Sequence, residues 1–270
     1  MDIIKFPRTR HIEGSRLQPG DLDDGVPLRS LAGAALVVAE KLDGANAALS
    51  FAPDGQLFLQ SRGHVLTGGG LERHFALFKT WATSHAARLF ARIGARFIIY
   101  GEWLYAKHTV FYDQLPHYFC EFDVWDREAG CFLSTPARRD LIGGLPIMPV
   151  PERHEGALRD LKALRSLIGP TPYKSPGWRA VLRQAATEAG TRPDRVDRQT
   201  EDSDLVEGLY LKREADGTIA ERFKFVRADF AQAVAAADSH WLSRPILPNR
   251  LAAGVDIFAP RLGLPGAYDG

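Results

Sequence analysis

The chain has few of the features that mark secreted, membrane or zinc-stabilised proteins. Its 270 residues include two cysteines, Cys120 and Cys131. Two are too few for a disulfide framework, and they lack the spacing of a zinc site. No apolar run approaches the roughly 18 residues that a membrane helix needs, and the N-terminal stretch MDIIKFPRTRHIEGS lacks the apolar segment of a signal peptide. We therefore expect a cytoplasmic protein that does not associate with a membrane.

Neither sign of charge dominates. There are 34 lysines and arginines against 33 acidic residues, so any surface for nucleic acid must be a local patch. The GxxxxGK[ST] phosphate-binding loop of kinases is also absent. Hydrophobic residues make up 45% of the chain, which is ordinary for a globular protein with a sizeable core. Composition thus predicts a globular protein, and its function must be inferred from local motifs.

Alternation of apolar and polar residues predicts a protein rich in strands. Two strands, at 35–41 and 46–52, are expected to form a hairpin across Asp43 and Gly44, because Asp-Gly favours tight turns. A third strand, at 56–62, follows a second turn. The remaining expected strands lie at 96–103, 118–126, 205–214 and 218–227, the last two joined as a hairpin at Asp216 and Gly217.

Helical periodicity appears between and after these strands. Apolar residues spaced three and four apart from Phe75 to Ile93 predict one long amphipathic helix that covers a sheet. Ser134 or Thr135, followed by Pro136, predicts the start of a short helix over 134–144. Further helical patterns cover 155–190 and 228–241, and 190–204 reads as a polar connector. The expected fold class is α+β, with antiparallel sheets flanked by helices.

Lys41, in the stretch EKLDGAN, has the setting of a nucleophile as well as that of a solvated lysine before a turn. A nucleophilic lysine must be neutral when it attacks, yet its ordinary pKa is about 10.4. We therefore expect nearby cations, a metal ion and desolvation to lower that pKa. The candidate groups at predicted strand ends and turns are the cations Lys212, Arg222 and Lys224 and the carboxylates Asp43, Glu102 and Glu207.

Six short motifs occur in a fixed order: EKLDGAN, QSRG, YGEW, FCEFDVWD, VEGLYLK and RFKF. The series resembles the ATP-dependent RNA ligases, the KxDGxN branch of the covalent nucleotidyltransferase superfamily, from about Lys5 to Arg227. This resemblance implies a nucleotidyltransferase (ATP-grasp-like) domain over residues 1–227. Residues 228–270 are then expected to form a helix and a Pro/Gly-rich tail packing on that domain, too short for an appended OB-fold domain.

The resemblance also implies which residues carry the chemistry. Lys41 would attack the α-phosphate of ATP to form lysyl-AMP, within the motif that includes Asp43. Glu207 would associate with Mg²⁺ or Mn²⁺, and Lys224 would engage the α-phosphate. ATP is therefore the expected co-substrate, and the expected catalytic set is Lys41, Asp43, Glu207 and Lys224.

Further positions match residues that bind the nucleotide. Glu40 would contact adenine, Glu102 would hold the ribose and Phe122 would stack on the base. The remaining expected nucleotide contacts are Asn46, Arg62, Lys212 and Arg222. Arg222 departs from family members that carry lysine there: arginine keeps the positive charge but cannot act as an acid near neutral pH.

The function implied is ATP-dependent joining of RNA 5′-phosphate and 3′-hydroxyl ends in RNA repair, through lysyl-AMP and RNA-adenylate. Because a kinase-type phosphate loop is absent, a separate kinase or phosphatase is expected to prepare the ends. Two other functions remain open from the sequence. One is a DNA or nick ligase of the same superfamily, and the other is a non-catalytic nucleotide- or RNA-binding module.

Overall fold

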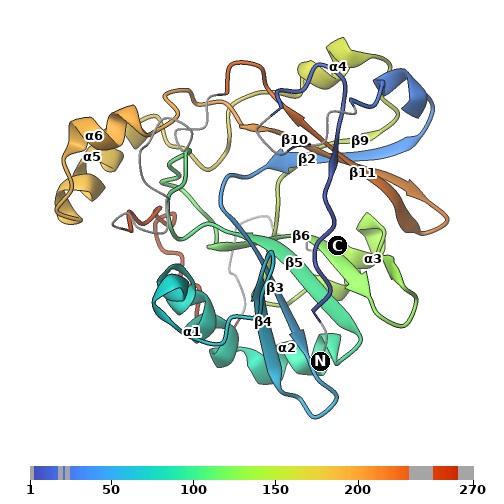
Figure 1. Ribbon diagram of the computed structural model, residues 1–270, viewed down its shortest axis with the longest axis horizontal. Helices are drawn as coiled ribbons and strands as arrows, with labels where there is room; N and C mark the ends of the chain where they lie inside the picture. The colour runs from blue at the N-terminus through green and yellow to red at the C-terminus, as the bar shows by residue number, and fades with distance from the viewer. Residues whose placement is uncertain (1–2, 18–20, 22–24, 231–245, 261–270) are drawn as a thin grey trace.

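Two β-sheets face each other across the centre of the molecule in the computed structural model, which describes residues 3–17, 21, 25–230 and 246–260 (Figure 1). The first sheet has the order β1 (Arg10–His11), β11 (Thr218–Val226), β10 (Gly208–Ala215), β2 (Ala35–Lys41) and β9 (Glu152–Gly156). The second has the order β4 (Leu57–Ser61), β3 (Ala45–Phe51), β5 (Phe97–Trp103), β6 (Phe119–Asp126) and β7 (Cys131–Phe132), with β8 (Met148–Pro149) beside β6. Apart from the β1–β11 and β6–β8 pairs, the neighbours are antiparallel. The expected fold class is confirmed.

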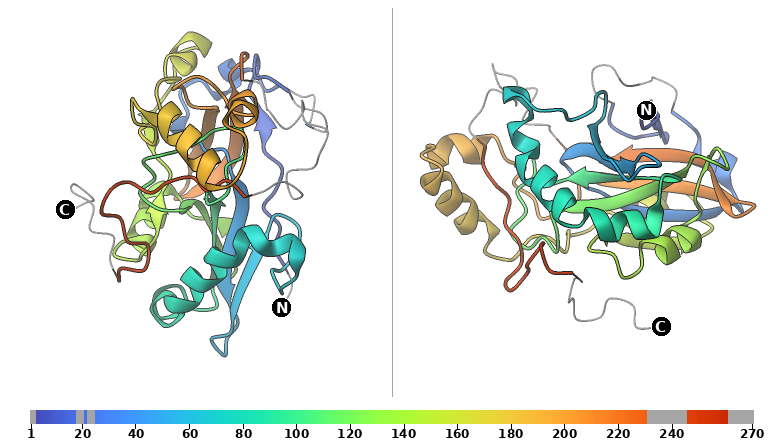
Figure 2. Two further views of the ribbon diagram at one scale, coloured as in Figure 1. Left: turned by 90° about the vertical axis from the view of Figure 1, so that its left-hand side faces the viewer. Right: turned by 90° about the horizontal axis from the view of Figure 1, so that it is seen from below.

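Helices cover the outer faces of both sheets (Figure 2). On the second sheet lie η2 (Gly70–Phe75), α1 (Ala76–Ser84) and α2 (Ala86–Ile93), which bury Phe78, Trp81 and Leu89 in the main core. On the first lie η1 (Leu28–Leu31) and α4 (Leu161–Arg165), and α3 (Thr135–Ile142) follows β7 with Ser134 at its N-cap position. Beside the sheets, α5 (Trp178–Glu188) packs against α6 (Pro193–Arg198). Among the described residues no helix has the length and apolar character to cross a bilayer.

Several expected elements differ from those observed. The single long helix is interrupted at His85, whose φ of −104° and ψ of 3° lie outside the α-helical region. The stretch 155–190 is mostly not helical, since it begins in β9 and has turns and irregular chain between α4 and α5. The predicted connector 190–204 contains α6. This helix has one buried side chain, Val196, and a single buried residue produces no hydrophobic periodicity in the sequence. The expected helix 228–241 lies largely outside the described residues.

The expected hairpin across Asp43 and Gly44 is wrong. Strand β2 pairs with β10 and β9 in the first sheet, whereas β3 pairs with β4 and β5 in the second. The chain therefore crosses from one sheet to the other at this point. The hairpin of β10 and β11 is as expected, with Asp216 and Gly217 at φ 52° and 73°, values typical of a two-residue turn.

Two segments far apart in sequence tie the layers together. The backbone carbonyl of Ile4 accepts hydrogen bonds from Gln60 and Tyr100 of the second sheet, and β1 pairs with β11 of the first. The N-terminal segment therefore spans both sheets, as the dark blue trace in Figure 1 shows. Near the other end, Asn249 is buried and bonds to Leu104 and Tyr112. The division of the chain at residue 227 stays a prediction.

Candidate active site

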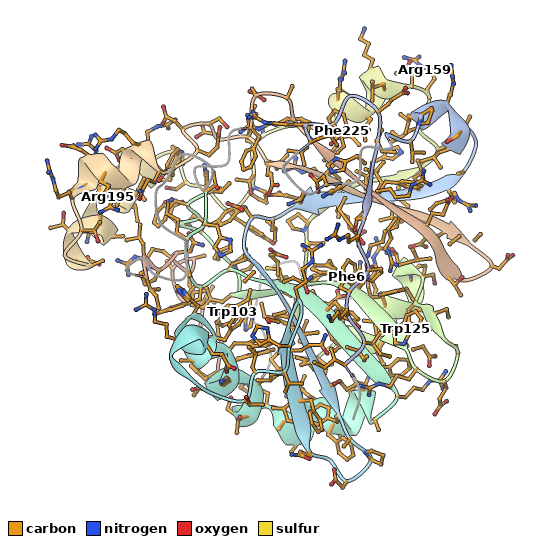
Figure 3. The ribbon with its side chains drawn as sticks, in the orientation of Figure 1. Phe6, Trp103, Trp125, Arg159, Arg195 and Phe225 are labelled. Carbon is orange, nitrogen blue, oxygen red and sulfur yellow. The ribbon has the colours of Figure 1, made fainter. Side chains whose placement is uncertain are left out.

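A cavity of about 650 Å³ lies between the two sheets. The first sheet contributes Glu40, Lys41, Tyr210 and Lys224 to its wall, and the second contributes Asn46, Glu102 and Phe122. The N-terminal segment closes one side with Phe6, which Figure 3 labels between the sheets. This wall brings together residues from most of the sequence motifs, although they are up to 184 positions apart, as are Glu40 and Lys224.

The crossing from β2 to β3 sets the position of Lys41, the last residue of β2. A Cβ atom on Gly44 would lie 2.7 Å from the Trp103 carbonyl oxygen and 2.8 Å from Leu104 Cδ2. Only glycine permits this approach to β5. The Gly44 N–H also donates to Glu102 Oε1 at 3.0 Å. The glycine therefore serves close packing between strands rather than the turn that the sequence suggested.

Asp43 is buried and anchors a loop beside the cavity. Its Oδ2 accepts hydrogen bonds from the backbone N–H groups of Thr109 and Val110, at 2.6 and 2.7 Å. Its own N–H donates to the Tyr112 hydroxyl at 3.0 Å. The neighbouring His108 lines the cavity. These contacts identify Asp43 as a residue that positions the site, and a direct catalytic role for it stays a prediction.

Lys41 forms an ion pair with Glu207, with 2.7 Å between Nζ and Oε1. The Lys41 side chain is 29% exposed, whereas that of Glu207 is fully buried. Burial by itself lowers the pKa of Lys41, but Glu207 and Glu102 more than offset this, and the pKa is raised. The sequence-based expectation of a lowered pKa invoked a bound metal as well as cations and burial; the carboxylates by themselves act in the opposite direction.

The pKa values of the two carboxyl groups around Lys41 are also shifted. Burial raises the pKa of Glu207 to about 7, although the charge on Lys41 opposes the shift. Burial likewise raises the pKa of Glu102 to about 8. A cluster of one amine, one buried carboxyl group and one half-buried carboxyl group, all with shifted pKa values, is typical of sites that transfer protons or bind charged substrates.

Lys224 lies in the same cavity wall as Lys41, on β11, which β10 separates from β2. It is held by a residue that the motifs did not indicate. Its Nζ is 2.7 Å from Asp21 Oδ1, and Asp21 Oδ2 is 3.0 Å from His11 Nε2. His11 is the register partner of Lys224 in the β1–β11 pair. Because Asp21 lies 203 positions before Lys224, no local pattern in the sequence could connect the two.

Part of the cavity wall is aromatic. The Phe122 ring is in edge contact with Phe6, with centroids 5.0 Å apart, and lies 6.0 Å from the Tyr210 ring. Glu40 is buried in the wall, Asn46 is the register partner of Glu102, and Arg62 is exposed just after β4. These residues could surround a flat base and a sugar.

Three predicted site residues do not line the cavity, among the residues described. Glu207 lies behind Lys41, as given above. Lys212 is buried, with Nζ 2.8 Å from Asp123 Oδ1 and a further hydrogen bond to the Phe122 carbonyl. The Arg222 guanidinium stacks 3.8 Å from the centroid of the Phe132 ring. Contacts of Lys212 and Arg222 with the nucleotide therefore stay predictions, while their observed contacts join the two sheets.

The carboxylates fit a divalent metal only in part. Within the described ranges, no cluster of three or more His, Cys, Asp or Glu residues could hold a metal by itself. Apart from the ion pair with Lys41, neither oxygen of Glu207 accepts a hydrogen bond from the residues that the structure describes. Magnesium is usually held by one or two carboxylates together with substrate phosphates, and it keeps several waters. The residues present fit a metal shared with a nucleotide rather than a protein-only metal site.

Comparison with known proteins decides the family. The model of the RNA ligase family matches residues 34–226. The chain belongs to the RNA ligase family. This range contains Lys41, Glu102, Glu207 and Lys224, so the resemblance drawn from the motifs is confirmed. No curated protein matches the chain.

Solved structures agree in fold with this RNA ligase family member. One mutant of the Naegleria gruberi RNA ligase with ATP and Mn is 14% identical, with a TM-score of 0.50 over 83% of this chain and 61% of that one. A second mutant with ATP and Mn is 15% identical, with a TM-score of 0.51 over 84% and 56% of the two chains. The chain thus spans less than two thirds of these relatives, and at such identities the likeness shows the fold alone.

Proposed function

We propose that this protein is an ATP-dependent RNA ligase, which joins 5′-phosphate and 3′-hydroxyl ends through lysyl-AMP and RNA-adenylate. The observation that carries the proposal is the placement of Lys41 at a 650 Å³ cavity, 2.7 Å from the buried Glu207 and in the same wall as Lys224. The family match and the agreement in fold support it.

In the first step, Lys41 Nζ attacks the α-phosphorus of ATP. A P–N bond forms, the bond from this phosphorus to the α–β bridging oxygen breaks, and pyrophosphate leaves. Lys41 must lose a proton before it attacks, and the nearest base is Glu207 Oε1 at 2.7 Å. The positive charge of Lys224 in the same wall stabilises the negative charge that spreads over the phosphoryl oxygens.

ATP and a divalent metal are proposed because the similar Naegleria gruberi structures contain ATP and Mn. Glu207, together with the phosphates, would hold Mg²⁺ or Mn²⁺, whose charge favours the neutral amine of Lys41 and screens the phosphates. Glu102 can accept hydrogen bonds from both ribose hydroxyls, and Phe122 offers a ring for the base. Glu40 offers an acceptor to the base, while Asn46 and Arg62 line the remaining wall.

The second and third steps are also displacements at phosphorus. An oxygen of the RNA 5′-phosphate attacks the AMP phosphorus, the P–N bond breaks, and the Lys41 amine is released. A 3′-hydroxyl then attacks the 5′-phosphorus of the RNA-adenylate, loses its proton and displaces AMP. A role in RNA repair, a cytoplasmic location and a separate enzyme that prepares the ends all stay predictions.

The test is incubation of wild type and Lys41→Ala with α-labelled ATP and Mg²⁺ or Mn²⁺, followed by denaturing electrophoresis. Labelled wild type with unlabelled Lys41→Ala is the expected result. Absence of label on wild type with either metal would instead favour a non-catalytic binding module.

The substrate is tested separately with nicked duplexes and single strands of RNA and DNA, each with a 5′-phosphate and a 3′-hydroxyl. Because the 2′-hydroxyl distinguishes RNA from DNA, an RNA ligase should require it at the ends being joined. Equal joining of all-DNA substrates would favour the DNA or nick ligase.

A further inference from the structure

The Lys224 ammonium is paired with a single carboxylate. Its Nζ lies 2.7 Å from Oδ1 of Asp21, and this is its one side-chain partner among the residues that the structure describes. Both residues line the cavity, and their side chains are 20% and 19% exposed. An ammonium group carries three N–H donors. Asp21 therefore uses one of them and leaves two for the oxygens of a phosphate.

Asp21 is backed by a buried histidine from the adjoining strand. Oδ2 of Asp21 lies 3.0 Å from Nε2 of His11, whose side chain is 1% exposed. His11 is opposite Lys224 in the β1–β11 pair, and the next N–H along β1, that of Ile12, donates to the Lys224 carbonyl at 3.0 Å. Strand pairing therefore fixes the histidine beside the lysine, and the Asp21 carboxylate contacts both.

The contacts of His11 determine which ring nitrogen carries the proton. A carboxylate oxygen can only accept, so Nε2, which has no better-aligned partner among the described residues, is the protonated nitrogen that faces Asp21. Nδ1 then accepts from the Ser15 hydroxyl at 2.7 Å, and that oxygen in turn accepts from the backbone N–H of Val226 at 2.9 Å. Burial and the charge of Lys224 lower the pKa of His11. The ring is therefore neutral, and it holds Asp21 without adding a charge.

The pairing has two opposing effects on a bound triphosphate. A lysine side chain that is not held loses rotamer freedom when it engages a ligand, and the contact with Asp21 removes that freedom beforehand. The carboxylate also repels the phosphate oxygens, which weakens binding of ATP. A fixed cation is most effective where charge develops in the transition state. Asp21 should therefore favour the rate of the reaction and not the affinity for ATP.

We propose that Asp21, backed by His11, is a positioning residue that holds the Lys224 ammonium where charge develops on the α-phosphate during adenylylation of Lys41. This inference rests on the proposed function and deepens it. Asp21 and His11 both precede the range 34–226 that the family model matches. The N-terminal segment would then contribute to catalysis, in addition to closing one side of the cavity with Phe6.

The experiment measures labelling by α-labelled ATP over a range of ATP concentrations, which gives the maximal rate and the half-saturating concentration. Asp21→Asn should lower the maximal rate about tenfold or more, the size expected for one hydrogen bond between charged groups, without raising the half-saturating concentration. Asp21→Glu, which keeps the charge, should recover part of the rate. Asp202→Asn is the matched control and should change neither quantity. Asp202 also forms an ion pair at 2.7 Å, with Arg179, but it is 85% exposed and does not line the cavity.

Two substitutions of His11 test the contact behind Asp21. His11→Gln has a side chain long enough to bring an amide N–H near the position of Nε2, so it should keep most of the maximal rate. His11→Asn is shorter, cannot reach Asp21 in the same way, and should lower the maximal rate as Asp21→Asn does. Equal rates for these two variants would contradict the role of His11, provided that both melt at the same temperature.

The two measured quantities separate positioning from the alternatives. If Asp21→Asn lowers the half-saturating concentration and leaves the maximal rate unchanged, Asp21 only competes with ATP for Lys224 and the positioning role is wrong. A variant that behaves like Asp202→Asn, or that only loses affinity for ATP, overturns the role as well. In each of these cases the ligase proposal stands. If wild type is not labelled at all, the proposed function and this inference fail together.

Discussion

Substitutions of Asp43 test whether this residue of the Lys41 motif takes part in the reaction or positions the loop beside the site. Asp43→Asn can keep both backbone bonds through its amide oxygen but loses the charge, and charge-assisted bonds are about twice as strong as neutral ones. The expected cost is about 1 kcal/mol per bond, or about 2 kcal/mol in all. Asp43→Ala leaves the buried N–H groups of Thr109 and Val110 without their acceptor, which costs about 2–6 kcal/mol.

The assay for Asp43 combines thermal unfolding with labelling by α-labelled ATP well below the melting temperature. At about 2–4 °C per kcal/mol for a chain of this size, Asp43→Asn should melt about 4–8 °C below wild type and keep measurable labelling. Asp54→Asn is the control, because Asp54 accepts one exposed backbone bond from Gln56 and its loss should cost less than about 0.5 kcal/mol. An Asp43→Asn protein that melts like wild type but is never labelled would refute the positioning role.

Three further outcomes are expected. Gly44→Ala places a Cβ 2.7 Å from the Trp103 carbonyl and should lower the free energy of unfolding in urea by about 1–3 kcal/mol, whereas Gly70→Ala, with open space around it, should not. Neighbouring carboxylates raise the pKa of Lys41 despite its burial, so the neutral amine becomes more abundant as pH rises. The labelling rate at saturating ATP should therefore rise by up to about tenfold per pH unit. A rate that is level or falls from about pH 6 to 9 contradicts this. Chelation of divalent metal should abolish labelling and added Mn²⁺ or Mg²⁺ should restore it, and labelling that persists in excess chelator argues against the metal.

Local patterns predicted several of the longer strands well, but they missed β9 and the two-residue strands β1, β7 and β8. The observed bounds of β2, β5 and β6 differ from the expected ranges by at most one residue, because alternation along a strand is recorded in adjacent residues. The β10–β11 hairpin was equally clear, since Asp216 and Gly217 accept the positive φ of its turn. The same dipeptide at Asp43 and Gly44 led to the wrong prediction of a hairpin, because its glycine is required by close contact with Trp103 and not by a turn.

The sequence by itself determined the family, the fold class and the motif that contains Lys41, because these depend on ordered motifs and on short-range periodicity. Only the tertiary structure decided the environment of those residues. The raised pKa of Lys41 comes from Glu207, which is 166 positions away along the chain. The Asp21–Lys224 and Glu40–Arg153 ion pairs likewise join distant segments. Electrostatic and hydrogen-bond effects depend on distance in space, which local sequence patterns do not record.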